Sequence, residues 1–230
     1  MVSIDRNKSQ APIYKKKGLG IQEAYEQIKH LIAINQLVPG QKLIYSDMAK
    51  KVNMGVTPII QALNRLEASG LVRYEANKGY FVGEITESEI RQLYQAREAL
   101  EICIIPDVIK NIDPEKLNEI RQSFKTNDSV RLSRRELILE DTRFHLAIAR
   151  YARNDVIYKL LEGIFEQVYL KYRPEYLDDD RVIVIKKEHR DLLNFLEIKD
   201  VDGTTVLIRD HIRSGMEYVI KTIKAEKAGF

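Results

Sequence analysis

The sequence predicts a mainly α protein with two domains. The first is a small domain of three helices and a β-hairpin, and the second is an all-α antiparallel bundle of about six helices. Apolar residues recur with a helical period along most of the chain. Short β-type runs flank a turn at residues 75–79. Charge also divides the chain, because residues 1–83 hold 12 Lys and Arg against 6 Asp and Glu, whereas residues 84–230 hold 25 against 28. This asymmetry suggests that only the first domain meets a polyanion.

The composition is that of a soluble globular protein. Among 230 residues, 44% are hydrophobic and 31% are charged. No apolar run approaches the roughly 18 residues of a membrane span, and no apolar stretch follows the N-terminal charges as it would in a secretory signal. The single cysteine, Cys103, excludes an internal disulfide and lies in an apolar helical run, so we expect a buried thiol. We therefore expect a cytoplasmic protein without a membrane partner.

The first domain is expected to follow a flexible basic arm at residues 1–18, which contains Lys15–Lys17. Residues 21–37 have a helical period that ends at Pro39-Gly40. Ser46 is expected to cap a second, short helix.

A third helix is predicted after the turn Asn53-Met54-Gly55. Thr57 is expected to cap it, Pro58 suits its first position, and Gly70 suits its end. Two β-type runs then form a hairpin with Lys78 near the tip. Three helices followed by a hairpin outline a winged helix-turn-helix over residues 19–83.

On the third helix, the stripe Ile59, Ala62, Leu63 and Leu66 is expected to face the core. Gln61 has the donor and acceptor that match an adenine edge, whereas Val56 and Ile60 offer DNA only contact with a thymine methyl group. An alternative is that these apolar residues complete a protein–protein surface and that the helix contacts no DNA. The predicted DNA-binding residues are Thr57, Ile60, Gln61, Asn64, Arg65 and Lys78. Further candidates for phosphate contacts are Lys15–Lys17, Lys42, Lys50, Lys51 and Arg73.

The second domain is predicted to span residues 84–230. Thr86 to Glu89 has the form of a capping box and begins a new helix, so the boundary falls at Gly83–Ile85. Periodicity and helix-breaking residues predict six helices. They begin near Thr86, Asp113-Pro114, Ser129, Asn154, Asp178 and Gly203.

Three of the four histidines lie in this second domain, and His30 is expected at the surface of the first. Asp141 and His145 are four residues apart and so share one helix face. His189 and His211 lie on other helices, and three bundle helices can aim these four side chains at one point. Three imidazoles and a carboxylate suit Zn²⁺, with Ni²⁺, Mn²⁺ and Fe²⁺ as alternatives. Histidines in core or surface roles, without a metal, are the other interpretation.

A metal-dependent enzyme that uses this three-His, one-Asp site to activate water or oxygen is an alternative function. Such an enzyme would not need a basic winged helix, and no separate base or nucleophile accompanies the four residues. We therefore expect no catalytic activity.

Motifs in both domains point to one family. The stretch Met54-Gly55-Val56-Thr57-Pro58-Ile59-Ile60-Gln61-Ala62-Leu63, together with Gly79-Tyr80-Phe81-Val82, resembles the GntR family of bacterial transcriptional regulators. The remainder looks like the FCD-type ligand-binding domain of the FadR branch of that family. The residues that carry this second resemblance are Arg97, Glu101, Asp141, Phe144, His145, Glu188, His189, Asp210 and His211.

The resemblance implies a homodimer that binds a palindromic operator in double-stranded DNA and a small carboxylic-acid effector. It also implies that Asp141, His145, His189 and His211 hold a divalent metal that helps to bind the effector. Glu188 is a candidate partner of a metal ligand, with a surface role as the alternative. Arg97 is a candidate for effector binding, but pairing with Glu101 one turn on is favoured.

One departure from the family pattern concerns DNA recognition. Family members typically show Ser-Arg-Thr-Pro-Val-Arg-Glu, and the two arginines that contact guanine are replaced here by Val56 and Ile60. The operator sequence therefore cannot be transferred from the family. We expect fewer guanine contacts and a larger share of affinity from phosphates and A·T steps.

Overall fold

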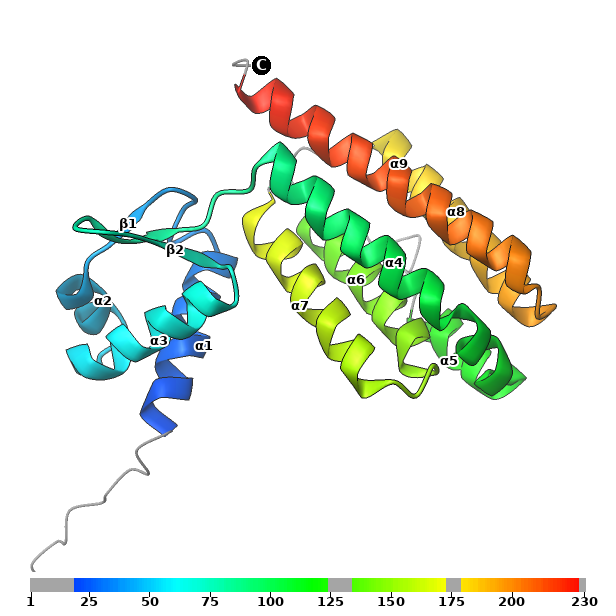
Figure 1. Cartoon of the computed structure of the whole chain (residues 1–230), viewed down its shortest axis with the longest axis horizontal. Coiled ribbons are helices and arrows are strands. Elements are labelled where there is room, and N and C mark those ends of the chain that lie inside the picture. The colour runs from blue at the N-terminus through cyan, green and yellow to red at the C-terminus, as the bar shows by residue number, and fades with distance from the viewer. Residues whose placement is uncertain (1–18, 124–133, 173–178, 228–230) are drawn as a thin grey trace, which may run out of the picture. The chain divides into compact units, whose positions relative to one another are not determined.

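The computed structural model describes residues 19–123, 134–172 and 179–227. Within these ranges it contains nine helices and a three-stranded sheet (Figure 1). The mainly α fold class is thereby confirmed. The predicted basic arm and the helix starts predicted at Ser129 and Asp178 lie outside the described residues.

The chain divides after Val82 into two compact units. Unit 1 contains α1 (Leu19–Ala33), β1 (Lys42–Leu43), α2 (Tyr45–Lys51), α3 (Val56–Ala68), β2 (Val72–Glu75) and β3 (Gly79–Val82). Unit 2 contains α4 (Glu87–Asn111), α5 (Pro114–Ser123), α6 (Arg134–Arg150), α7 (Asp155–Lys171), α8 (Asp179–Glu197) and α9 (Val201–Lys227).

The core of unit 1 follows the predicted stripe on α3. Ile59, Leu63 and Leu66 are fully buried, because apolar residues three and four apart share one helix face. Helix α3 packs against α1, where Ile28 is also fully buried. The predicted hairpin is present, with Tyr74 opposite Tyr80 in an antiparallel pair. The sheet order is β1-β3-β2. Sequence patterns did not predict β1, because two residues are too short for an alternating pattern.

Two predicted helix caps are wrong. Helix α2 begins at Tyr45 with Ile44 as its N-cap, so Ser46 is already helical. Helix α3 begins at Val56 with Gly55 as its N-cap, which makes Pro58 its third residue rather than its first. Proline is accepted there because the first four N–H groups of a helix have no partner within the helix. Thr57 is consequently an exposed residue of the first turn.

Unit 2 is a bundle in which α4 packs against α6, α7 and α9 (Figure 1). As predicted, Thr86 caps α4, since its side chain accepts a hydrogen bond from the Glu89 amide at 3.1 Å. The buried face of α4 repeats every three or four residues through Ile90, Ile105 and Val108. Cys103 falls off this face and is exposed, so its predicted burial is wrong. Helix α9 begins at Val201, two residues before the predicted Gly203.

Among the described residues, no helix combines the length and the apolarity that a membrane crossing would need.

Candidate metal centre and DNA-contacting helix

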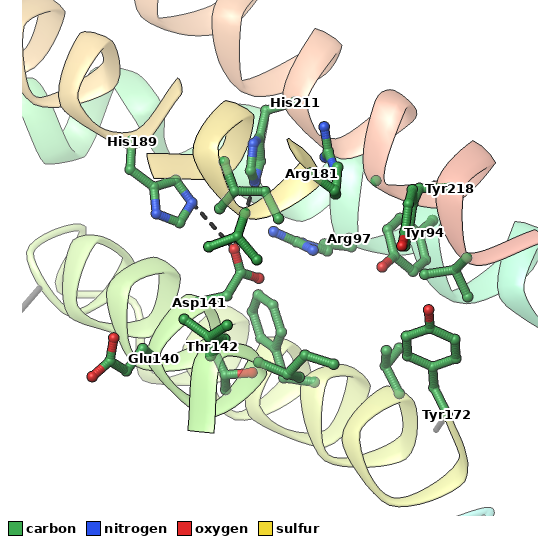
Figure 2. A pocket seen from close by; sticks show the side chains of 18 of the residues that line it. Tyr94, Arg97, Glu140, Asp141, Thr142, Tyr172, Arg181, His189, His211 and Tyr218 are labelled. Atoms are coloured by element: carbon green, nitrogen blue, oxygen red, sulfur yellow. Dashed lines mark ion pairs between the residues drawn. The ribbon is translucent and has the colours of Figure 1, made fainter. Parts of the chain in front are cut away.

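Three helices of unit 2 bring the four predicted metal ligands to one point. Asp141 and His145 come from α6, His189 from α8 and His211 from α9. Figure 2 shows His189 and His211 beside Asp141. One potential ligand atom of each lies within 4.8 Å of the others. The Oδ1 atom of Asp141 is 3.2 Å from His189 Nε2, 3.7 Å from His145 Nε2 and 3.9 Å from His211 Nε2. The three histidine side chains are almost fully buried.

Two carboxylates hold the outer nitrogens of two of these imidazoles. His145 Nδ1 is 2.7 Å from Glu101 Oε2, and His211 Nδ1 is 2.7 Å from Glu188 Oε2. A carboxylate at Nδ1 favours the tautomer with its proton there, which leaves the Nε2 lone pair facing the centre. Glu188 precedes His189 in sequence but contacts His211, so it is a partner within the centre rather than a surface residue. Sequence reasoning paired Glu101 with Arg97 alone and missed its contact with His145, for which a single sequence contains no signal.

Arg97 lies beside this cluster and is 5% exposed. Its Nε donates to Glu101 Oε1 at 2.5 Å, which is the favoured sequence prediction. Its guanidinium also lies 4.5 Å from the centroid of the Phe165 ring. Among the residues that the structure describes, its buried Nη2 has no hydrogen-bond partner. A buried N–H without a partner is costly, so this atom is suited to bind an anion.

Burial and neighbouring charges set the protonation of the cluster. Burial lowers the pKa of His189 to about 3 and, together with the nearby His145, lowers the pKa of His211 to about 3. Burial also acts to lower the pKa of His145, but the Glu101 and Asp141 carboxylates together outweigh it and the pKa is raised. Burial acts to raise the pKa of Asp141, yet His145 and His189 hold it well below its usual range. Near neutral pH, His189 and His211 are therefore neutral and Asp141 is ionised, as metal ligands must be.

The donor set fits a divalent cation. His145 Nε2 and His211 Nε2 lie 3.1 Å apart. In the metal-free chain, the raised pKa of His145 favours a proton on its Nε2, and this N–H can donate to the lone pair of His211 Nε2 at this distance. A divalent cation at the centre would take the place of that proton. Three imidazole nitrogens and one carboxylate oxygen are a donor set that zinc and other first-row divalent metals accept.

We expect metal-free protein to lose stability as the pH falls below about 6.5. The unfolded chain protonates His189 and His211 near their usual pKa, whereas the folded chain resists protonation down to about 3. His145 opposes this effect near neutral pH, because the folded chain holds a proton there that the unfolded chain has partly released. Below about pH 6 both states hold this proton, so one histidine does not cancel the effect of two. Each extra proton bound by the unfolded state lowers stability by up to ~1.4 kcal/mol per pH unit. Urea unfolding in excess chelator at about pH 7 and about pH 5 measures this, and equal stability would contradict it.

A cavity adjoins the cluster and encloses about 930 Å³ of empty space, including the part open to solvent. Asp141, His189 and His211 form part of its wall, and Arg97 and Arg181 add positive charge. Tyr94, Tyr172 and Tyr218 lie together on one side of it (Figure 2). Most other lining side chains are apolar, among them Leu137, Ile138, Phe165, Val168, Val182, Ile185 and Val219. This combination suits a small organic anion with an apolar body.

In unit 1, the predicted DNA-binding side chains are distributed over α3 and the hairpin. Thr57, Gln61, Asn64 and Arg65 are exposed on α3, and Ile60 is half-buried. Lys78 is exposed near the hairpin tip and pairs with Glu75 at 3.0 Å.

A winged helix-turn-helix joined to a helical bundle with a cavity beside a cluster of histidines is the architecture of a DNA-binding transcriptional regulator with a ligand domain. The description "Bacterial regulatory proteins, gntR family" matches residues 21–82, and the FCD domain matches residues 92–214. The chain therefore belongs to the GntR family of transcriptional regulators, in its branch with an FCD domain.

Known regulators match along most of the chain. The HTH-type transcriptional regulator YdhC of Bacillus subtilis (strain 168) is 22% identical over 88% of this chain and 92% of its own length. McbR of Escherichia coli (strain K12), also an HTH-type transcriptional regulator, is 24% identical over 76% of this chain and 81% of its own length. The solved structure of E. coli McbR/YncC has a TM-score of 0.71 at 18% identity, covering 89% of this chain and 98% of that one. At this identity, the structural likeness supports the fold alone.

Proposed function

We propose that this regulator is a cytoplasmic homodimer whose affinity for a palindromic operator is controlled by a small carboxylic acid bound beside a divalent metal. The observation that carries this proposal is the convergence of four potential ligand atoms within 4.8 Å at the wall of a cavity. The named relatives are regulators, which supports a regulatory rather than an enzymatic role.

Asp141, His145, His189 and His211 would hold the metal, through Oδ1 and three Nε2 atoms. Zinc is the first choice for this donor set, with nickel, manganese and iron as alternatives. Glu101 and Glu188 would orient His145 and His211 through their 2.7 Å contacts. The bound ion would supply positive charge at the cavity wall, which attracts a carboxylate.

Arg97 would bind the effector carboxylate through Nη2. Glu101 and the Phe165 ring already hold the guanidinium, so little side-chain freedom is lost when an anion binds. An N–H that has no other buried partner gains a charge-assisted hydrogen bond. The apolar lining would cover the body of the acid, which favours small acids with a hydrocarbon or aromatic body over highly charged ones.

Operator binding would use Thr57, Ile60 and Gln61 on α3 at the bases, and Asn64 and Arg65 on α3 with Lys78 on the hairpin at the phosphates. Two copies related by a twofold axis would place two such helices on the two halves of a palindrome. The dimer would have two arrangements, which place the two winged domains at different separations. The effector would change operator affinity only by its difference in affinity for these two arrangements.

Two measurements on the full chain test this function. Native mass spectrometry with metal analysis of the protein as purified should find one divalent ion per chain and a co-purified small acid. Binding to operator-length duplex DNA should weaken steeply with salt, because lysine and arginine contacts release counterions from phosphates. A metal-free protein with no cavity ligand would contradict the sensor function. Duplex affinity that does not change with salt would contradict DNA binding.

A further inference from the structure

The first half of α3 has no charged side chain on its exposed face. No residue from Val56 to Asn64 is ionisable. Val56 is 44% exposed, Thr57 and Gln61 are exposed, and Ile60 is half-buried. In a helix-turn-helix, the N-terminal residues of the second helix contact base edges in the major groove. Here those residues offer methyl groups, one hydroxyl and one amide.

The polar side chains that follow on α3 are engaged within the protein. Arg65 Nη1 donates to Gln22 Oε1 at 2.8 Å, and its guanidinium lies 4.8 Å from the centroid of the Tyr25 ring. Asn64 Oδ1 accepts a hydrogen bond from the Tyr80 hydroxyl. Both contacts direct these two side chains toward α1 and β3.

Gln61 differs from these two neighbours. In the described part of the chain, nothing forms a hydrogen bond with its exposed amide. Its N–H and C=O groups therefore remain available together, as a bidentate contact with a base requires.

We propose that direct base recognition by this regulator is selective for A·T pairs, with Gln61 contacting adenine and with Val56 and Ile60 contacting thymine methyl groups. Adenine presents one donor and one acceptor in the major groove, which an amide matches, whereas guanine presents two acceptors and favours arginine or lysine. The inference rests on the proposed operator binding and adds the class of base pair that the operator must contain.

Selection of bound duplexes from a randomised library by the full chain tests the proposal. We expect half-sites enriched in A·T pairs under α3. Gln61→Ala should reduce the preference for adenine at one position roughly tenfold, whereas Ile60→Arg should introduce a guanine at another. Lys78→Ala is the matched control, because loss of a phosphate contact weakens binding to all sequences without changing the preference.

The possible results of this selection distinguish selectivity for A·T pairs from operator binding itself. A guanine-centred half-site for the unmodified chain would overturn the inference and leave operator binding intact. A·T enrichment that survives Gln61→Ala unchanged would also overturn it, because selection would then come from DNA shape. If the chain binds no duplex even at low salt, operator binding itself fails, and the inference fails with it.

Discussion

Exchanging His189 for glutamine is expected to abolish binding of the divalent ion at the centre. His189 Nε2 lies 3.2 Å from Asp141 Oδ1, and an amide is a much poorer ligand for zinc-like metals than an imidazole. Loss of only an outer partner of a ligand costs about 10- to 100-fold in metal affinity, so loss of a ligand should cost more than about 100-fold. Metal analysis after dialysis should therefore find one ion per unmodified chain and almost none in the variant.

The same variant should lose the stability that the ion contributes. At an ion concentration about 100 times the dissociation constant, binding stabilises the folded state by ~2.7 kcal/mol. For a chain of this size, that free energy corresponds to a difference in Tm of roughly 5–10 °C. The difference between the two proteins should disappear in excess chelator, apart from the intrinsic effect of the substitution.

Two further variants make this test specific. His30→Gln is the matched control, because His30 is exposed on α1 in the other unit and should leave metal content and Tm unchanged. Asp141→Asn removes the carboxylate charge with little change of volume, and should also lose the ion if His189→Gln proves unable to fold. A His189→Gln protein that keeps one ion per chain would show that the four residues are not the metal site.

Glu101→Ala is expected to destabilise the folded chain by about 3–5 kcal/mol, even in excess chelator. Glu101 is 4% exposed and contacts both Arg97 Nε and His145 Nδ1. Burial acts to raise the pKa of Glu101, but Arg97 and His145 lower it to about 2, so the side chain is ionised at neutral pH. Removing it leaves the Arg97 charge buried without its partner, which is the costly way to break a buried ion pair.

The measurement is urea unfolding of the unmodified chain, Glu101→Ala and Glu98→Ala, with chelator in all samples. Glu98 lies three residues earlier on α4 and pairs with the exposed side chain of Arg213 at 2.8 Å. Its loss should cost no more than about 1 kcal/mol, because solvent screens such pairs. Equal stability of the two variants would show that Arg97 does not depend on Glu101.

Glu101→Gln refines this prediction. The amide oxygen can still accept a hydrogen bond from Arg97 or from His145, but the negative charge is gone. Its stability should lie between those of the unmodified chain and Glu101→Ala. If Glu101→Gln matched Glu101→Ala, the hydrogen bonds would contribute little beyond the charge.

Local patterns predicted the elements on which the site is built. The apolar stripe on α3 and the paired β-type runs depend on spacing within one segment, and the structure contains both. The N-caps predicted at Ser46 and Thr57 were wrong. Several residues near each helix start could act as the N-cap, and the competing backbone geometries differ by little energy. The burial of Cys103 was wrong, because an apolar run on a helix covers all faces, and packing decides which face is inside.

By itself, the sequence determined two domains, the helix that we predict to contact DNA and the four side chains of the candidate centre. These follow from periodicity, from the four-residue spacing of Asp141 and His145, and from resemblance to a family. Only the tertiary structure decided that Glu101 contacts His145 across 44 positions and that Glu188 contacts His211 rather than its neighbour in sequence. It also decided that Arg65 turns toward Gln22 and Tyr25. The physical reason is that spacing along one helix decides on which face of that helix a side chain lies. Which side chain of another helix it contacts depends on how the two helices pack.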